Sequence, residues 1–119
     1  MSPRAKTFGQ ILRDKRLSSK ISLRKFAEMV GVSPTYLSQV EQNNVMPPTA
    51  DRVKCMAEIL GESADEWIAL AGRVPDDLSE IIHRHPTQIP ELLREANGLS
   101  SAQLTKLQEQ IKKMKEADR

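Results

Sequence analysis

Residues 22–41 read SLRKFAEMVGVSPTYLSQVE, and this stretch decides the fold that we predict for the chain. Its spacing suits two short helices that cross at a steep angle, because such a pair needs a small residue at the contact and a turn residue that tolerates positive φ. Ala27 supplies the small residue, and Gly31 follows four positions later. Ser33 and Pro34 then start the second helix, with serine as its N-cap and proline at its first position.

The apolar residues of this stretch recur at helical spacing, so each helix has one face for a core. They are Phe26, Val30, Val32, Leu37 and Val40. An ordinary helical hairpin would meet the same requirements. The presence of all these features together favours a helix-turn-helix, the motif that lays its second helix in the major groove of DNA.

The predicted outward face of the second helix also favours DNA over a plain hairpin. It carries polar, uncharged side chains that suit base edges and phosphates, whereas a merely solvated face would more often carry Glu and Lys. These residues are Thr35, Tyr36, Ser38, Gln39 and Gln42. Residues 1–25 contain eight basic residues and one acidic residue, while residues 73–119 contain eight of each. A basic end can attract a polyanion, although a solvated basic surface has the same composition.

Start and stop signals divide the chain into about eight helices, and no segment alternates as a strand would. Three capping boxes are predicted, at Thr7 with Gln10, Ser63 with Glu66, and Ser100 with Gln103, together with an N-cap at Thr87. Gly72–Pro75 resembles a boundary. We therefore expect an all-α protein, with a five-helix domain at residues 1–72 and a helical C-terminal region at residues 73–119. Core positions outside residues 22–41 include Cys55, Trp67, Ile68 and Leu70.

Over residues 8–72 the chain resembles the XRE group of helix-turn-helix proteins, whose relatives include the phage lambda repressor and Cro. The resemblance rests on Phe26-Ala27, Gly31-Val32-Ser33, Leu37-Ser38, Glu41 and Pro48. It implies a lambda-repressor-like domain whose third helix enters the major groove. It further implies a sequence-specific transcriptional regulator, most simply a repressor that binds a palindromic operator as a homodimer.

Two positions depart from the family pattern. Leu23 stands where the family often has a glutamine that bridges phosphate and the recognition helix, so that contact is lost or moves to Arg24. Gln42-Asn43 replaces the common glycine after Glu41. The turn can still form because Asn tolerates the left-handed conformation, but the backbone contact to phosphate is put in doubt.

Carried over by position, the resemblance assigns base readout to Thr35, Ser38 and Gln39. Gln39 could bond an adenine edge in bidentate fashion. Contacts to the DNA backbone are expected from Arg24, Lys25, Tyr36, Gln42, Asn43 and Asn44. For each residue the alternative is a solvent-facing role with no DNA contact.

The last helical pattern has the 3-4-3 spacing of a coiled-coil seam, at Leu104, Leu107, Ile111 and Met114. Two heptads are short for an independent coiled coil, so the alternatives are a helix packed on its own domain and a homodimerisation element. Similarity also suggests regulation, because some XRE-type repressors of this length are encoded beside a zinc peptidase that cuts their C-terminal part. Two rival functions remain: an antitoxin whose C-terminal part inhibits a toxin, and a protein-interaction module that does not bind DNA.

No other chemistry is predicted. His83 and His85 are two apart, which points their side chains in divergent directions on a helix, so no metal site is expected. Cys55 is the only cysteine, which fits a reducing cytoplasm. No catalytic motif, cofactor loop, export signal or membrane span is apparent, so we do not expect an enzyme.

Overall fold

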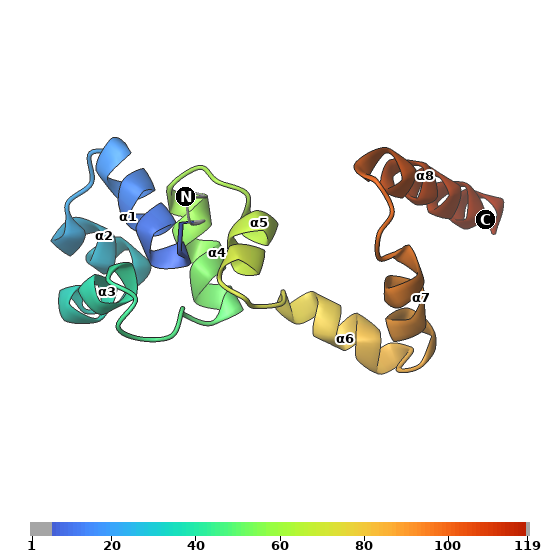
Figure 1. The fold of residues 1–119 in the computed structure, drawn as a ribbon, viewed down its shortest axis with the longest axis horizontal. Coiled ribbons are helices and arrows are strands. Elements are labelled where there is room, and N and C mark those ends of the chain that lie inside the picture. The colour runs from blue at the N-terminus through green and yellow to red at the C-terminus, as the bar shows by residue number, and fades with distance from the viewer. Residues whose placement is uncertain (1–5, 119) are drawn as a thin grey trace, which may run out of the picture. The chain divides into compact units, whose positions relative to one another are not determined.

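A computed structural model describes residues 6–118 of the chain and shows eight α-helices and no strand within them (Figure 1). The all-α prediction is thereby confirmed. The helices are α1 (Phe8–Ser18), α2 (Leu23–Val30), α3 (Pro34–Glu41), α4 (Ala50–Ile59), α5 (Ala64–Leu70), α6 (Asp76–Arg84), α7 (Gln88–Ala96) and α8 (Ser101–Ala117). The chain divides into two compact units, Met1–Ser79 and Glu80–Arg119, so the division falls inside α6. A functional boundary at Gly72 stays a prediction.

The helix starts largely follow the predicted caps. Thr7 with Gln10 and Ser100 with Gln103 form reciprocal capping boxes at α1 and α8. The box predicted at Ser63 is only half formed, since Ser63 Oγ accepts from the Glu66 N–H at 3.3 Å without a return bond from Glu66. Thr87 is the N-cap residue of α7 as predicted, but it does not cap the helix with its side chain. Its backbone is already helical, with φ −105° and ψ −49°, and its side chain makes no capping bond, whereas a capping side chain needs an extended backbone.

The hydrophobic core lies among α1 to α5, as the helical spacing predicted. Its largest fully buried side chains are Phe26, Leu12, Leu37, Met56, Val40 and Val53. The ring of Phe8 meets that of Trp67 edge to face, with 5.9 Å between centroids, which joins α1 to α5.

Two core assignments were wrong. Leu70 is 50% exposed because Trp67 and Ile68 occupy the core-facing side of α5 and leave Leu70 on its outer side. Cys55 is only half-buried and lies outside the core cluster.

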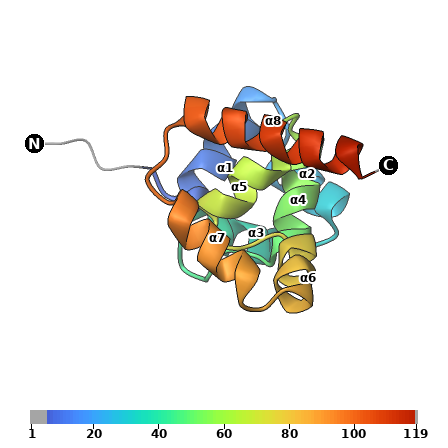
Figure 2. The same cartoon turned by 90° about the vertical axis from the view of Figure 1, so that its right-hand side faces the viewer.

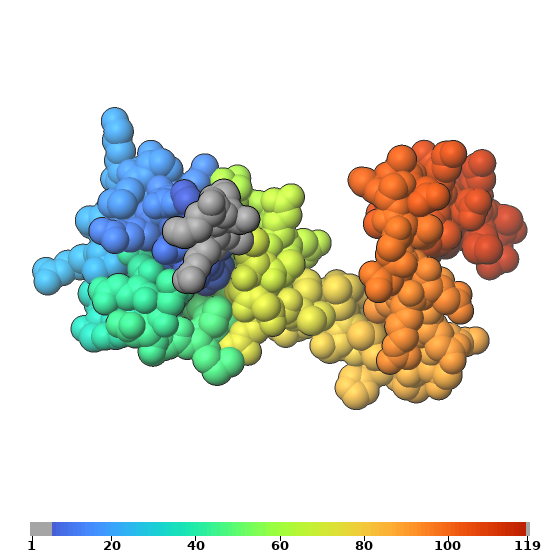
Figure 3. Space-filling view, viewed as in Figure 1, coloured from blue at the N-terminus to red at the C-terminus, as the bar shows by residue number. Residues whose placement is uncertain are grey.

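The start of α1 lies against the end of α3, and Gly9 permits this approach. The space-filling view shows α1 (blue) and α3 (green) packed directly side by side (Figure 3). A Cβ atom added at Gly9 would collide with the carbonyl oxygen of Val40. It would also lie 2.7 Å from Asn43 Oδ1 and 2.8 Å from the carbonyl oxygen of Glu41. Two of these three atoms belong to the backbone and cannot simply swing away. The position therefore requires glycine for close approach, although glycine is a poor helix former.

The Gly9→Ala variant is expected to lower the free energy of unfolding by about 1–3 kcal/mol, the usual effect of forcing an extra carbon into a packed contact. Urea unfolding followed by circular dichroism measures this directly. Helix propensity alone predicts a higher free energy of unfolding for this variant, since alanine is more favourable than glycine in a helix interior by about 1 kcal/mol. An unchanged or more stable variant would therefore contradict the close contact.

The C-terminal helices differ from the first five, because none of α6, α7 and α8 contains a buried residue. In two perpendicular views α7 and α8 do not lie side by side (Figures 1 and 2). Their apolar side chains remain largely exposed, including Leu93 at 58% and Met114 at 69%. Over residues 6–118, none of the helices combines the length and apolarity needed to cross a membrane.

Candidate nucleic-acid interface

The turn between α2 and α3 is built as the sequence predicted. Gly31 has φ +86°, and both its N–H and that of Val32 donate to the carbonyl oxygen of Ala27 at 2.9 Å. Ala27 is fully buried, which lets α2 and α3 approach closely. Arg52 of α4 adds a bond that sequence spacing did not indicate, from Nη1 to the carbonyl oxygen of Gly31 at 3.3 Å. The turn between α2 and α3 is therefore held by hydrogen bonds to α2 and by a bond from α4.

Helix α3 presents a polar side away from the core. Its start is capped by Ser33, whose Oγ accepts from the Tyr36 N–H at 3.0 Å, and Pro34 occupies its first turn as predicted. Leu37 and Val40 are buried. Thr35 is exposed, whereas Ser38 and Gln39 are half-buried. All three residues predicted to read bases thus remain accessible on one short helix.

Tyr36 departs from the predicted outward face. It is half-buried and packs against the core, because an aromatic ring of this size gains more from apolar contact than from full hydration. Its contact to the DNA backbone stays a prediction.

The end of α3 gathers several predicted contact residues into one hydrogen-bonded group. Gln42 Nε2 donates to Ser38 Oγ at 2.9 Å, and Asn44 Nδ2 donates to Gln42 Oε1 at 3.3 Å. Asn43 has φ +61°, so asparagine makes the left-handed turn that glycine makes elsewhere in the family. Gln42, Asn43 and Asn44 are all exposed. The structure thus joins Ser38, predicted to read a base, to two residues predicted to contact the DNA backbone.

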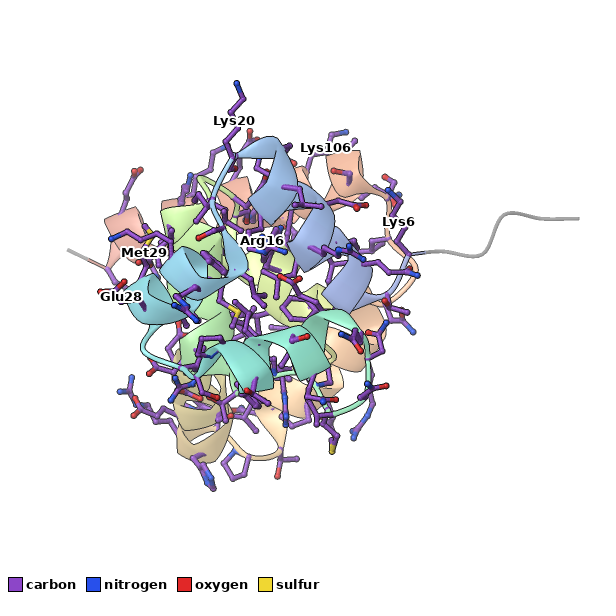
Figure 4. The ribbon with its side chains drawn as sticks, turned by 90° about the vertical axis from the view of Figure 1, so that its left-hand side faces the viewer. Lys6, Arg16, Lys20, Glu28, Met29 and Lys106 are labelled. Carbon is purple, nitrogen blue, oxygen red and sulfur yellow. The ribbon has the colours of Figure 1, made fainter. Side chains whose placement is uncertain are left out.

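A buried ion pair holds α3 against α1, and the sequence analysis missed it. Arg16 Nε donates to Glu41 Oε2 at 2.7 Å and Arg16 Nη2 donates to Glu41 Oε1 at 3.0 Å. A third bond runs from Arg16 Nη1 to the carbonyl oxygen of Ile21 at 2.9 Å. Figure 4 shows Arg16 directed inward from α1, whereas Lys20 extends outward from the turn after it. The fork geometry of arginine suits this bidentate contact.

Basic residues lie on α1 and α2 beside this end of α3. Arg24 and Lys25 are exposed on α2, and Lys25 Nζ lies 4.0 Å from Glu28 Oε2, a weak surface pair. A shallow cavity of about 180 Å³ is lined by Arg13, Arg16, Leu23, Ser38, Glu41 and Gln42. Arg13 is a cation on this face that the sequence analysis did not select. Leu23 is half-buried and packs on the core, as expected for an apolar residue that replaces a polar bridge.

Residues 12–67 match the family model described as helix-turn-helix. The matched range begins inside α1 and ends inside α5, and it includes the whole α2–turn–α3 unit. These residues form a helix-turn-helix domain. The XRE resemblance predicted from residues 26–48 is thereby confirmed.

The helix-turn-helix domain also has named relatives. The chain is 36% identical over 74 residues to an uncharacterised helix-turn-helix-type transcriptional regulator of Mycobacterium tuberculosis, in strains CDC 1551 / Oshkosh and ATCC 25618 / H37Rv. The match covers 61% of this chain and 52% of the relative, so the chain spans about half the length of the curated relatives it matches. Among solved structures it is similar to the DNA-binding domain of the P22 c2 repressor, with a TM-score of 0.50 and 26% identity over 56% of this chain and 86% of that one.

Proposed function

We propose that this protein is a sequence-specific DNA-binding transcriptional repressor whose helix α3 lies in the major groove. The observation that carries the proposal is the polar side of α3, which holds Thr35, Ser38 and Gln39 accessible on a helix fixed from behind by the core and by the Arg16–Glu41 pair. Rigid support matters because base readout requires donors and acceptors at set positions. The similarity to the P22 c2 repressor domain supports the same assignment.

The contact residues divide into two groups with different roles. Thr35, Ser38 and Gln39 would read base edges and so discriminate among sequences. The residues around them, exposed except for the half-buried Tyr36, would contact phosphates, which orient the protein and add affinity without discrimination. These are Arg24, Lys25, Tyr36, Gln42, Asn43 and Asn44.

The Gln39→Ala variant tests the proposal. The wild-type protein is expected to prefer DNA from upstream of its own gene over scrambled DNA by about 10³-fold or more. Loss of a bidentate base contact costs about 1–3 kcal/mol, so the variant should lose roughly 5- to 150-fold of affinity for the specific DNA and little for the scrambled DNA. Fluorescence anisotropy at two salt concentrations measures both affinities.

Lys25→Ala is the matched control, since it removes a neighbouring exposed side chain that is assigned to phosphate. It should weaken binding to both DNAs about equally and lower the slope of log affinity against log salt by about 0.9. Wild-type binding with no preference, and with complete loss at higher salt, would overturn the proposal. The helix-turn-helix would then act as a protein-interaction module.

We further propose that the repressor binds a palindromic operator as a homodimer. One domain of this kind spans a single half-site, and a dimer reaches two half-sites about 34 Å apart. The apolar stripe of α8 supports an interface in the C-terminal region, since Leu104, Ile111 and Met114 are exposed and Leu107 is only half-buried. If a fragment that ends near Gly72 sediments as the same dimer as the full chain, this location is wrong.

Relief of repression by proteolysis is the proposed regulation. Cleavage needs accessible backbone, and helices without buried residues open locally at low free-energy cost. The helices α6, α7 and α8 meet this condition. A zinc peptidase encoded beside the gene should cut the chain there, and an intact chain after incubation with that peptidase would exclude the idea.

A further inference from the structure

The hydroxyl of Ser38 on α3 is held differently from the one that Thr105 carries on α8. Thr105 Oγ1 donates to the carbonyl oxygen of Ser101 at 3.0 Å, the common bond of a helical hydroxyl to the preceding turn. Ser38 Oγ instead accepts from Gln42 Nε2 at 2.9 Å. Within residues 6–118, no acceptor takes a hydrogen bond from Ser38 Oγ. The single hydroxyl proton of Ser38 therefore remains available to a ligand.

The direction of the bond between Gln42 and Ser38 is set by Asn44. Asn44 Nδ2 donates to Gln42 Oε1 at 3.3 Å, so the carbonyl end of the Gln42 amide faces Asn44 and its NH₂ end faces Ser38. Asn44 is fixed in turn, because its backbone N–H donates to the carbonyl oxygen of Gln39 at 3.0 Å. Gln42 follows Ser38 by four residues, the spacing at which helical side chains meet. The three side chains thus form a relay of donors that runs from Asn44 to Ser38.

The charged side chains near Ser38 do not take its proton. Ser38 and Gln42 both line the cavity of about 180 Å³ at the end of α3. The charged residues of this cavity are Arg13 and Arg16, which only donate, and Glu41, whose two oxygens both accept from Arg16. The acceptor for the Ser38 hydroxyl is therefore supplied from outside the protein, on the polar side of α3.

We propose that Gln42 is a positioning residue that makes Ser38 a hydrogen-bond donor toward DNA, so that Ser38 selects a base with an acceptor in the major groove. Guanine, adenine and thymine each present an acceptor there, whereas cytosine presents only its N4 donor. Ser38 thus rejects cytosine at the base that it faces. This inference rests on the proposed function and names the chemical group that Ser38 reads. Without Gln42, the hydroxyl is free to turn back onto its own helix, as that of Thr105 does.

This positioning role is distinct from a contact to the DNA backbone. The Gln42 amide has two N–H groups, and the bond to Ser38 uses one of them, which leaves the other for a phosphate. A backbone contact adds affinity for every sequence alike. A positioning role changes the preference at one base instead. The two roles of Gln42 are therefore separated by measuring affinity position by position along the DNA.

Cytosine scanning with the Gln42→Met variant tests the proposal. Cytosine is placed in turn at each position of one half-site in DNA from upstream of the gene, and fluorescence anisotropy gives the affinity of the full-length protein. At the position that Ser38 faces, cytosine should weaken wild-type binding by about 2- to 10-fold, the effect of one lost hydrogen bond. Ser38→Ala identifies that position because it removes the effect there. Gln42→Met should remove the same effect, and the double variant should show no further change at that position.

Two controls accompany the scan. Lys25→Ala represents a pure backbone contact, so it should lower affinity for every DNA about equally and keep the rejection of cytosine. Gln42 is exposed, so methionine requires no repacking of the core. Base preferences that Gln42→Met retains at the other positions show that this variant is folded.

The outcomes separate this inference from the proposed function. If Gln42→Met lowers affinity for all DNAs equally and still rejects cytosine, Gln42 only contacts the backbone and the positioning role is wrong. The inference is also wrong if Ser38→Ala changes no base preference, or if the position that it changes prefers cytosine. Wild-type protein that shows no preference for its upstream DNA would overturn the proposed function, and this inference with it.

Discussion

The Glu41→Gln variant is expected to lose about 3–5 kcal/mol of folding stability, the usual cost of leaving one charge of a buried ion pair uncompensated. Glutamine keeps the shape of the side chain but removes the charge that faces the Arg16 guanidinium at 2.7 and 3.0 Å. Both side chains are more than nine-tenths buried, so water cannot replace the lost partner. Urea unfolding monitored by circular dichroism gives the change in free energy.

A surface ion pair in the same domain supplies the control. Lys6 Nζ lies 2.7 Å from Asp14 Oδ2, but both side chains are more than half exposed. Asp14→Asn makes the same change of acid to amide and should cost at most about 1 kcal/mol. If Glu41→Gln costs no more than Asp14→Asn, the buried pair does not hold α3 in the way the geometry indicates.

Replacing both Arg16 and Glu41 shows whether charge or packing dominates the contribution of this pair to folding stability. The Arg16→Met/Glu41→Leu variant removes the two charges together and should recover most of the loss, because apolar side chains of similar size often substitute well for a buried pair. Recovery should be incomplete, since the carbonyl oxygen of Ile21 also loses the donor that Arg16 supplies. A double variant that is as unstable as Glu41→Gln would indicate that packing, rather than charge, dominates at this site.

The features that sequence predicted well are those set by neighbours in the chain. Capping at Thr7 and Ser33, the positive φ of Gly31 and the left-handed Asn43 each depend on residues within four positions. Buried positions such as Phe26 and Leu37 follow from helical periodicity, since one face of each helix must meet the core. Local patterns therefore sufficed to predict an all-α fold with a helix-turn-helix.

The features that sequence missed depend on contacts between distant residues. Arg16 and Glu41 are 25 residues apart, and nothing in the periodicity of either helix indicates that they meet. The role of Gly9 appears only once α1 lies against the end of α3. Leu70 was misassigned because a short helix with several apolar residues does not reveal which side faces the core. For the same reason, sequence identified Ser38 as a contact residue but not the hydrogen bond that it accepts from Gln42.

The Leu107→Gln/Ile111→Gln variant is expected to lower the affinity for a two-half-site operator by about 10²–10⁴-fold. In a dimer, binding of one domain holds the second domain at a high effective concentration near the other half-site, and the variant loses this advantage because its domains are no longer linked. Its affinity for DNA with one half-site should not change, since α8 lies outside residues 12–67 that form the DNA-binding domain. Anisotropy titrations with the two DNAs separate the two effects. The labelled DNA is held below the dissociation constant of the operator complex, and the protein concentration is varied across it.

The Lys106→Gln/Lys113→Gln variant is the matched control, as it places two glutamines on the opposite side of the same helix. It should keep operator affinity to within a small factor. Equal losses for both DNAs in the Leu107→Gln/Ile111→Gln variant would point to a damaged DNA-binding domain rather than to a lost dimer. Unchanged operator affinity would mean that α8 does not join two copies on DNA, and the dimer interface would then have to lie within the helix-turn-helix domain itself.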